Sequence, residues 1–298
     1  MIPESDKILA SIVGNYGNVN IVKITDGWDS QVFVVNSRRV YKIPSTHRKG
    51  SPLKEHFLLK LLRPSLGRLV PSHPELYLYN RGREPIQVLS YDFIPGTTLE
   101  SSFPVSDSEQ MAIAVSFFRI FQVIHSTWVP ANRFLSAGSG LSSWKGRYAE
   151  MKARFTGENY PELQGNLIDY VQSLLSDFMA DLRNFRFTPT FIHGDIDPRN
   201  IIWDRPRLCV AGLIDWAEAD YGDPAFDAAS LFFHEGLGLK YLKISGLAVN
   251  ADAVHRIEFY HRLVPVYWIE YGYRNDDSTL IRKGTEELLA RRNFSIRL

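Results

Sequence analysis

The feature that most limits the fold of this chain is a change in hydrophobic pattern at Ile94-Pro95-Gly96. Before it, apolar residues occur in short β-branched and aromatic runs bounded by turn residues, which is typical of strands. After it, apolar residues mostly recur at helical spacing, and a Pro-Gly pair separates the two patterns. The predicted strands are residues 21–25, 31–36, 39–44, 76–79 and 85–93.

One amphipathic helix is predicted within the strand-rich part, over residues 52–62. Four apolar side chains share one face at helical spacing, and we expect that face to turn inward. They are Leu53, Phe57, Leu58 and Leu61. The first two strands are expected to form a hairpin. Residues 1–93 therefore predict a small antiparallel sheet with one helix.

The rest of the chain predicts a mainly helical lobe with a short β-hairpin in its middle. Ser106 and Glu109 match a capping box at the start of a helix. Further helices are predicted over 143–155 and 163–184. Short apolar runs at 190–195, 201–204 and 209–216 then interrupt the helical pattern. The fold class is α+β, without the regular strand–helix alternation of a doubly wound sheet.

Composition limits the partners and the compartment. A net charge of +1 gives no general reason to expect nucleic acid or an anionic membrane, and no protein partner is evident. Cys209 is the only cysteine, so no internal disulfide forms, which fits a reducing cytoplasm. The first residues lack the pattern of a signal peptide. No apolar run is long enough for a transmembrane helix.

The densest polar signal is the run from His193 to Asn200, followed at residues 214–216 by Ile-Asp-Trp. Phosphoryl transfer from a nucleotide needs a carboxylate near the acceptor hydroxyl and hard oxygen ligands for magnesium. Asp195 and Asn200 offer a base and an oxygen ligand from one loop. Asp215, at the end of the next strand pair, offers a second ligand.

The motifs HGDIDPRN, LIDW and GDPAFDAA resemble those of the aminoglycoside phosphotransferase family within the kinase-like superfamily. This resemblance implies a bilobal protein-kinase-like fold, with a nucleotide-binding lobe over 1–93 and a catalytic and substrate-binding lobe over 94–298. It implies Mg²⁺ as cofactor and ATP or GTP as co-substrate. Asp195 would be the catalytic base, and Asn200 and Asp215 would be the metal ligands.

The resemblance also implies nucleotide contacts in the first lobe. Lys42, on the third strand, would contact the phosphates, and Glu55 on the helix would orient it. The loop from Gly27 to Ser30 would cover the phosphates, although it departs from the protein-kinase glycine motif. The segment between the lobes would hold the base, through Asp92, Phe93 and Ile94.

Other features argue against a protein kinase and for structural roles of two further acids. Gly194 stands where protein kinases have an arginine, and only seven residues separate Asp215 from Asp223. That leaves no room for a long activation segment. Asp223, followed by Pro224, is typical of a helix start. Asp227 is expected to hold the catalytic loop by hydrogen bonds.

The acceptor is the least constrained part of the prediction. Residues 195–235 contain nine acidic and three basic residues, a balance that would attract a cationic small molecule or form a solvated acidic loop. An aromatic and acidic cluster follows in the C-terminal helices, similar to the subgroup that phosphorylates the 2″-hydroxyl of aminoglycosides. The candidate acceptor residues are Glu218, Asp220, Glu235, Trp268, Glu270 and Tyr271.

Three alternatives to an aminoglycoside kinase stay open. Macrolide phosphotransferases have a similar IDWAEA segment. Choline and homoserine kinases share the same signature. An inactive pseudokinase acting as a binding module is the third, against which the intact Lys42, Asp195, Asn200 and Asp215 argue.

Overall fold

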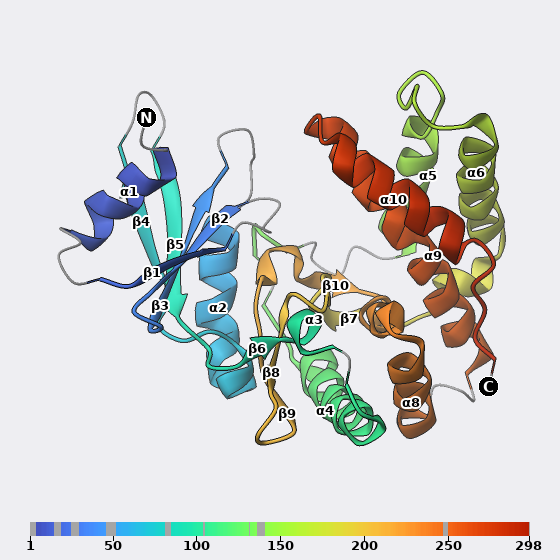
Figure 1. Cartoon of the computed structure of the whole chain (residues 1–298). Helices are drawn as coiled ribbons and strands as arrows, with labels where there is room; N and C mark the ends of the chain where they lie inside the picture. The colour runs from blue at the N-terminus through green and yellow to red at the C-terminus, as the bar shows by residue number, and fades with distance from the viewer. Residues whose placement is uncertain are drawn as a thin grey trace. The chain divides into compact units, whose positions relative to one another are not determined.

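The computed structural model describes residues 4–14, 19–24, 30–45, 52–80, 85–103, 105–130, 132–135, 141–246 and 250–297, with only the backbone at 141–143 and 235. The chain forms two compact units (Figure 1). Unit 1 comprises Met1–Glu109 and Asp195–Ala219, and unit 2 comprises Gln110–Gly194 and Asp220–Leu298. The loop from Asp195 to Asn200, which we call the catalytic loop after its predicted role, thus belongs to the same unit as the N-terminal sheet. The lobe boundary at residue 94 stays a prediction.

Unit 1 contains a five-stranded antiparallel sheet, as predicted, with the strand order β1-β2-β3-β5-β4. Its strands are β1 (Ile21–Ile24), β2 (Ser30–Val35), β3 (Arg39–Pro44), β4 (Glu75–Tyr79) and β5 (Ile86–Asp92). A helix that was not predicted, α1 (Glu4–Val13), packs Ile8 and Leu9 against a core that includes Phe33 and Ile43. In β3, Lys42 lies opposite Val32 on one side and Leu89 on the other.

The helix α2 (Pro52–Leu66) is longer than predicted and turns a different stripe inward. Leu58, Leu59, Leu62 and Leu66 are buried together with Glu55, whereas Leu53, Phe57 and Leu61 are only half-buried. The predicted apolar face was therefore wrong by part of a turn. A buried glutamate needs a buried cation, so the position of Glu55 opposite Lys42 decides which stripe faces the sheet.

A second small sheet in unit 1 connects the HGDIDPRN segment to the Ile-Asp-Trp segment at residues 214–216. It has the strand order β6-β8-β9 and is followed by a single 3₁₀ turn, η3 (Trp216–Glu218). The elements are β6 (Thr97–Thr98), helix α3 (Leu99–Ser102), β8 (Ile201–Asp204) and β9 (Cys209–Leu213). Gly96 lies close to this sheet, at a φ of +143°, and an added Cβ would come within 2.8 Å of the Trp203 carbonyl oxygen. Only glycine fits there.

Helices make up most of unit 2, as predicted. They are α4 (Asp107–Ser126), which begins in unit 1, α5 (Leu141–Arg154), α6 (Gly165–Ala180), α7 (Pro224–Ala229), α8 (Glu235–Ser245), α9 (Ala251–Arg274) and α10 (Ser278–Arg291). The predicted capping box is confirmed: the Glu109 amide donates to Ser106 Oγ at 3.2 Å, and the Ser106 amide donates to Glu109 Oε2 at 2.8 Å. Within the described residues, no helix is both long and apolar enough to cross a membrane.

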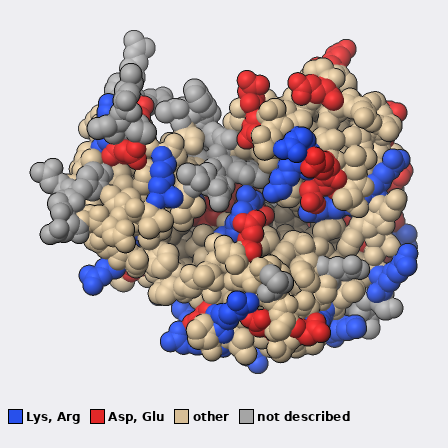
Figure 2. All heavy atoms as spheres, viewed as in Figure 1, with Lys and Arg blue, Asp and Glu red and all other residues tan. Residues whose placement is uncertain are grey.

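Short strands β7 (Thr190–Ile192) and β10 (Asp220–Gly222) pair antiparallel in unit 2, and β10 was not predicted. The helix start at Asp223 is confirmed, because its carboxylate accepts the Ala225 amide at 3.0 Å and Pro224 opens α7. On the face shown in Figure 2, basic and acidic side chains are interspersed among the described residues, which agrees with the net charge of +1.

Candidate active site

A buried ion pair links the N-terminal sheet to α2. The Lys42 ammonium lies 2.6 Å from Glu55 Oε2, and both residues are buried. Burial alone would lower the pKa of Lys42, but the negative charges of Asp215 and Glu55 outweigh it and raise that pKa well above its usual value. Lys42 is therefore a permanent cation at this position.

Asp215, which lies just after β9, joins this pair. Its Oδ1 lies 3.0 Å from the Lys42 ammonium, and Glu55 Oε1 accepts the amide of Trp216 at 3.3 Å. Asp215 has a φ of +65°, in the left-handed region that non-glycine residues seldom adopt and that often marks functional sites. Its side chain is 42% exposed, so it can still reach a ligand.

The loop from Asp195 to Asn200 is held by short internal hydrogen bonds. The side-chain amide of Asn200 donates to Asp195 Oδ2 at 2.9 Å and to the Asp195 carbonyl at 3.1 Å. The Ile214 amide donates to the Asn200 carbonyl at 2.9 Å, and Ile201 pairs with Leu213. Asn200 and Asp215 therefore lie just beyond the same end of the β8–β9 hairpin.

Negative charge accumulates around Asp195. Removal from bulk water raises the pKa of its carboxyl group well above the usual range, and repulsion from Asp215, Asp197 and Glu218 raises it further. Asp195 itself keeps exposed surface. A site with this excess of carboxylates favours a bound cation.

The donor set at this end of the hairpin suits magnesium. The Asn200 side-chain nitrogen is used by Asp195, which assigns the amide oxygen as the atom left for a metal. That oxygen and the Asp215 carboxylate are hard ligands, and Mg²⁺ commonly takes one or two protein ligands and fills its shell with water and phosphate. Among the described residues, no group of three or more His, Cys, Asp and Glu forms a complete metal cage.

Unit 2 holds the backbone that leads into this loop. The fully buried Asp227 accepts the amides of His193 at 3.1 Å and Gly194 at 3.0 Å, and His125 Nε2 lies 3.1 Å from its carboxylate. Gly194 has a φ of +78°, which glycine adopts without strain. The expected structural role of Asp227 is confirmed, since these bonds fix the two residues that directly precede Asp195.

The predicted base-binding segment is partly engaged within the fold. The Asp92 amide donates to the Ser72 carbonyl at 2.9 Å, and the Phe93 amide donates to the Arg38 carbonyl at 2.8 Å. The Asp92 carboxylate binds Arg39 at 2.8 Å, Ser72 at 3.0 Å and His73. The backbone amides of Asp92 and Phe93 are thus already used within the fold. The predicted contacts with the nucleotide base are left to Ile94 and to the backbone carbonyl oxygens of this segment. Ser30 begins β2, and Gly27 lies outside the described residues.

The predicted acceptor residues are distributed over both units. Glu218 lies in η3 of unit 1, Asp220 opens β10, and the Glu235 side chain is outside the described part of the structure. In α9, Glu270 is buried and contacts Arg154 and the Tyr160 hydroxyl, both at 3.3 Å.

Two further predicted acceptor residues lie on α9. The Trp268 ring has Lys283 at 5.2 Å and Arg291 at 5.6 Å, and the Tyr271 carbonyl accepts the Asn275 side chain at 2.7 Å. Contacts within the fold thus engage Trp268 and Tyr271, as they engage Glu270, and an acceptor role for the three residues stays a prediction.

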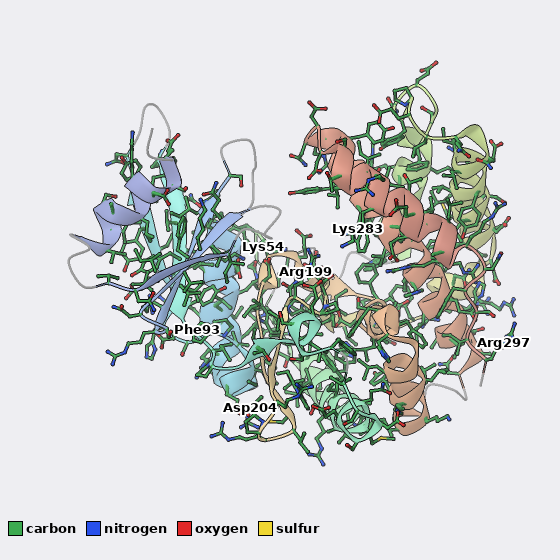
Figure 3. The ribbon with its side chains drawn as sticks, viewed as in Figure 1. Lys54, Phe93, Arg199, Asp204, Lys283 and Arg297 are labelled. Carbon is green, nitrogen blue, oxygen red and sulfur yellow. The ribbon has the colours of Figure 1, made fainter. Side chains whose placement is uncertain are left out.

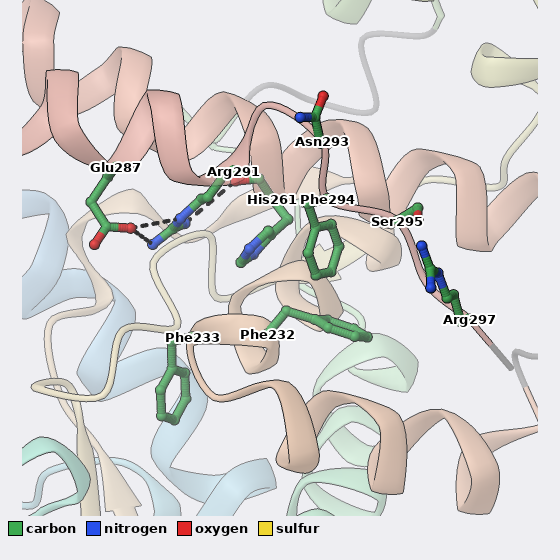
Figure 4. A pocket seen from close by; sticks show the side chains of 9 residues that line it. All are labelled: Phe232, Phe233, His261, Glu287, Arg291, Asn293, Phe294, Ser295 and Arg297. Carbon is green, nitrogen blue, oxygen red and sulfur yellow. Dashed lines mark hydrogen bonds and ion pairs between the residues drawn. The ribbon is translucent and has the colours of Figure 1, made fainter.

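A separate hollow of about 480 Å³ lies in unit 2, and none of the predicted site residues lines it (Figure 4). His261 and Phe294 line it, with ring centres 4.2 Å apart and planes tilted by 43°. Burial lowers the pKa of His261 to about 3, so the ring is neutral at ordinary pH. The Arg291 guanidinium is already paired with Glu287 at 2.9 Å.

An ion pair within the loop from Asp195 to Asn200 was not predicted from the sequence. Arg199 Nε lies 2.7 Å from Asp197 Oδ1, between the predicted base and the predicted metal ligand. Opposite charges on either side of Pro198 are the only signal in the sequence, and such a pair is recognisable only once the turn is known.

Comparison with known proteins identifies the family. The profile described as the phosphotransferase enzyme family (APH) matches residues 20–249. The chain belongs to this family. A solved structure of the GDP and kanamycin complex of APH(2″)-IIIa is similar over 98% of this chain and 100% of that chain, with a TM-score of 0.78 and 19% identity. At such identity the similarity establishes the fold, and it confirms the predicted fold class.

Two other relatives differ in how much of the chain they match. The streptomycin–ATP complex of APH(2″)-IIa is similar over 97% of both chains, with a TM-score of 0.69 and 21% identity. Viomycin phosphotransferase of Streptomyces vinaceus is 31% identical over 104 residues. That match spans 33% of this chain and only 35% of the relative's length.

Proposed function

We propose that this family member is a small-molecule kinase, which transfers the γ-phosphate of ATP or GTP to a hydroxyl group of an aminoglycoside. One observation carries the proposal: the continuous set of contacts from Glu55 through Lys42 to Asp215, beside Asp195 and Asn200 on the same hairpin end. These groups supply a phosphate-binding cation, a base and oxygen ligands within one compact unit.

Each side chain has a defined part in the proposed reaction. Lys42 binds the α- and β-phosphates, and Glu55 holds it in place. Asp195 orients the acceptor hydroxyl and accepts its proton as the new oxygen–phosphorus bond forms. Asn200 and Asp215 hold Mg²⁺, which when bound supplies positive charge against the phosphate oxygens. Asp227 acts through the backbone of His193 and Gly194 and so keeps Asp195 in position.

The acceptor class rests on charge and on the relatives. The acids around Asp195 favour a cationic acceptor, and structures of similar fold hold kanamycin and streptomycin. A second candidate acceptor is viomycin, because a viomycin phosphotransferase matches a third of the chain. We place the reaction in the cytoplasm, where ATP and GTP are available and the single cysteine stays reduced.

A coupled assay of nucleoside-diphosphate release tests the proposal. ATP and GTP are supplied in parallel, with kanamycin, streptomycin, viomycin, a macrolide, choline and homoserine as acceptors, and with Asp195→Asn as the control variant. We expect turnover with an aminoglycoside or viomycin that depends on Asp195. Asp195-dependent turnover on choline, homoserine or the macrolide alone would overturn the acceptor assignment. Tight nucleotide binding without transfer to any acceptor would favour a binding module.

A further inference from the structure

The proposed mechanism leaves one well-placed cation of the catalytic loop without a role. Arg199 lies four residues after Asp195 and directly before Asn200. Its Nε and Nη2 donate to the two Asp197 carboxylate oxygens at 2.7 and 3.2 Å, and its backbone amide donates to Asp197 Oδ1 at 2.9 Å. One carboxylate therefore fixes both the backbone and the guanidinium of Arg199, in the two-pronged geometry that suits arginine.

Asp197 is itself rigidly held. Its amide donates to the Asp195 carbonyl at 3.0 Å, and its carbonyl accepts the Asn200 amide at 2.8 Å. The carbonyl of Pro198 accepts the Glu100 amide of α3 at 3.2 Å. Proline also fixes the backbone between Asp197 and Arg199. The guanidinium is thus preorganised relative to Asp195 rather than free to sample the solvent.

A similar ion pair at the other end of β8 shows what is particular about Arg199. Arg207 lies 2.5 Å from Asp204 in the hairpin turn, but its side chain is 76% exposed, compared with 29% for Arg199. Figure 3 labels Arg199 and Asp204 at opposite ends of this strand. The charge of Arg199 also acts on Asp195 and opposes the neighbouring acids. A half-buried, fixed cation next to the base has the properties needed to stabilise a developing anion.

We propose that Arg199 is a further catalytic residue, which donates hydrogen bonds to the phosphoryl group during transfer, and that Asp197 is its positioning residue. This inference rests on the proposed kinase function. In the step, the acceptor oxygen bonds to the γ-phosphorus while the bond to the β–γ bridging oxygen breaks. The nucleoside diphosphate leaves with that bonding pair, and the hydroxyl proton passes to Asp195. Arg199 gives up no proton, because a guanidinium stays protonated.

The test measures a mimic of the transferred group, so it does not depend on knowing the acceptor. Binding of ADP and GDP with magnesium is measured by calorimetry, with and without aluminium fluoride, which mimics the phosphoryl group in the transition state of transfer. Arg199→Ala should bind the diphosphates with an affinity within about twofold of wild type. The factor by which aluminium fluoride increases that affinity should be about 100-fold smaller than in wild type. Arg199→Lys should restore part of it, and Asp197→Asn should lose less than Arg199→Ala.

The matched control is Arg207→Ala, which removes the exposed arginine of the hairpin turn and should behave as wild type. With an acceptor found in the coupled assay, Arg199→Ala should lower kcat about 100-fold with little change in KM. The inference would be overturned if aluminium fluoride increased the diphosphate affinity of Arg199→Ala as much as that of wild type. It would also be overturned if the substitution changed only the KM for the acceptor. In both cases the kinase function would stand. A wild-type protein that binds no nucleotide would instead overturn the proposed function, and with it this inference.

Discussion

The loop from Asp195 to Asn200 in unit 1 and the start of helix α7 in unit 2 both carry acidic residues, but their surroundings treat the charge differently. Around Asp195, four carboxylates lie within electrostatic reach of one another, and their repulsion raises its pKa. In unit 2, Asp223 has Arg256 at 2.5 Å and the Tyr260 hydroxyl at 2.8 Å. A buried carboxylate paired with its cation leaves no charge uncompensated in the fold, whereas accumulated like charges indicate a site that a ligand completes.

The largest effect expected from this comparison concerns Asp215. Asp215→Ala removes a proposed metal ligand and one of the two anions beside Lys42. We expect turnover to fall by about 100-fold or more, and magnesium to lose most of its effect on nucleotide affinity. Calorimetric titrations with magnesium and with EDTA check this. A variant that keeps the full magnesium effect would remove Asp215 from the metal site.

The buried pair of unit 2 should respond in stability instead. Arg256→Met leaves the Asp223 carboxylate buried without its cation, which should lower the free energy of unfolding by about 3 kcal/mol. Denaturant titration measures the change. The double variant Asp223→Asn/Arg256→Met is the control, and it should recover part of the loss because no charge stays buried. If the single variant were as stable as wild type, the pair would not be structural.

His261 is a second buried group of unit 2 that should affect stability, and its effect should depend on pH. The pKa of His261 is lowered to about 3, mainly by burial, so the unfolded chain binds the proton first as the pH falls. As the pH falls from about 6.5, the pKa in the unfolded chain, to about 3, the pKa in the fold, this histidine progressively lowers the free energy of unfolding. His261→Phe should reduce the stability lost between pH 7 and pH 5 by about 2 kcal/mol. Identical pH profiles for variant and wild type would contradict the neutral assignment.

The smallest effect concerns a cap that belongs to neither charge pattern. Ser106→Ala removes the side-chain oxygen that accepts the Glu109 amide at the start of α4. The free energy of unfolding should fall by about 1 kcal/mol, because one backbone donor of the first turn loses its partner. Turnover should not change. Ser106→Thr keeps the hydroxyl and serves as the control, and a Ser106→Ala variant with impaired catalysis would show that the cap matters beyond stability.

The sequence predicted that the loop from Asp195 to Asn200 and Asp215 come together, because a single short hairpin separates them along the chain. Asn200 and Asp215 flank a short strand pair, so pairing Ile201 with Leu213 brings them together. The pairing of Lys42 with Glu55 was implied by the family resemblance, and the structure brings the two side chains together.

Other features depend on orientations that a sequence does not state. The acid-and-aromatic pattern of α9 does not reveal that Glu270 faces Arg154 and Tyr160 inside the unit. The sequence pattern likewise did not reveal which face of α2 is buried, or that Asp197 and Arg199 form an ion pair. Each depends on a side-chain direction fixed by partners distant in sequence or by the shape of a turn.

The most direct test of the account measures stability and turnover on one variant, Asp195→Asn, with the same protein sample. If the carboxylates of the catalytic loop are present for catalysis, removing one charge should leave the free energy of unfolding unchanged or higher, because repulsion falls. Turnover should be lost while nucleotide binding persists. A variant that unfolds as readily as Arg256→Met but still transfers phosphate would contradict the account, since Asp195 would then be a structural residue.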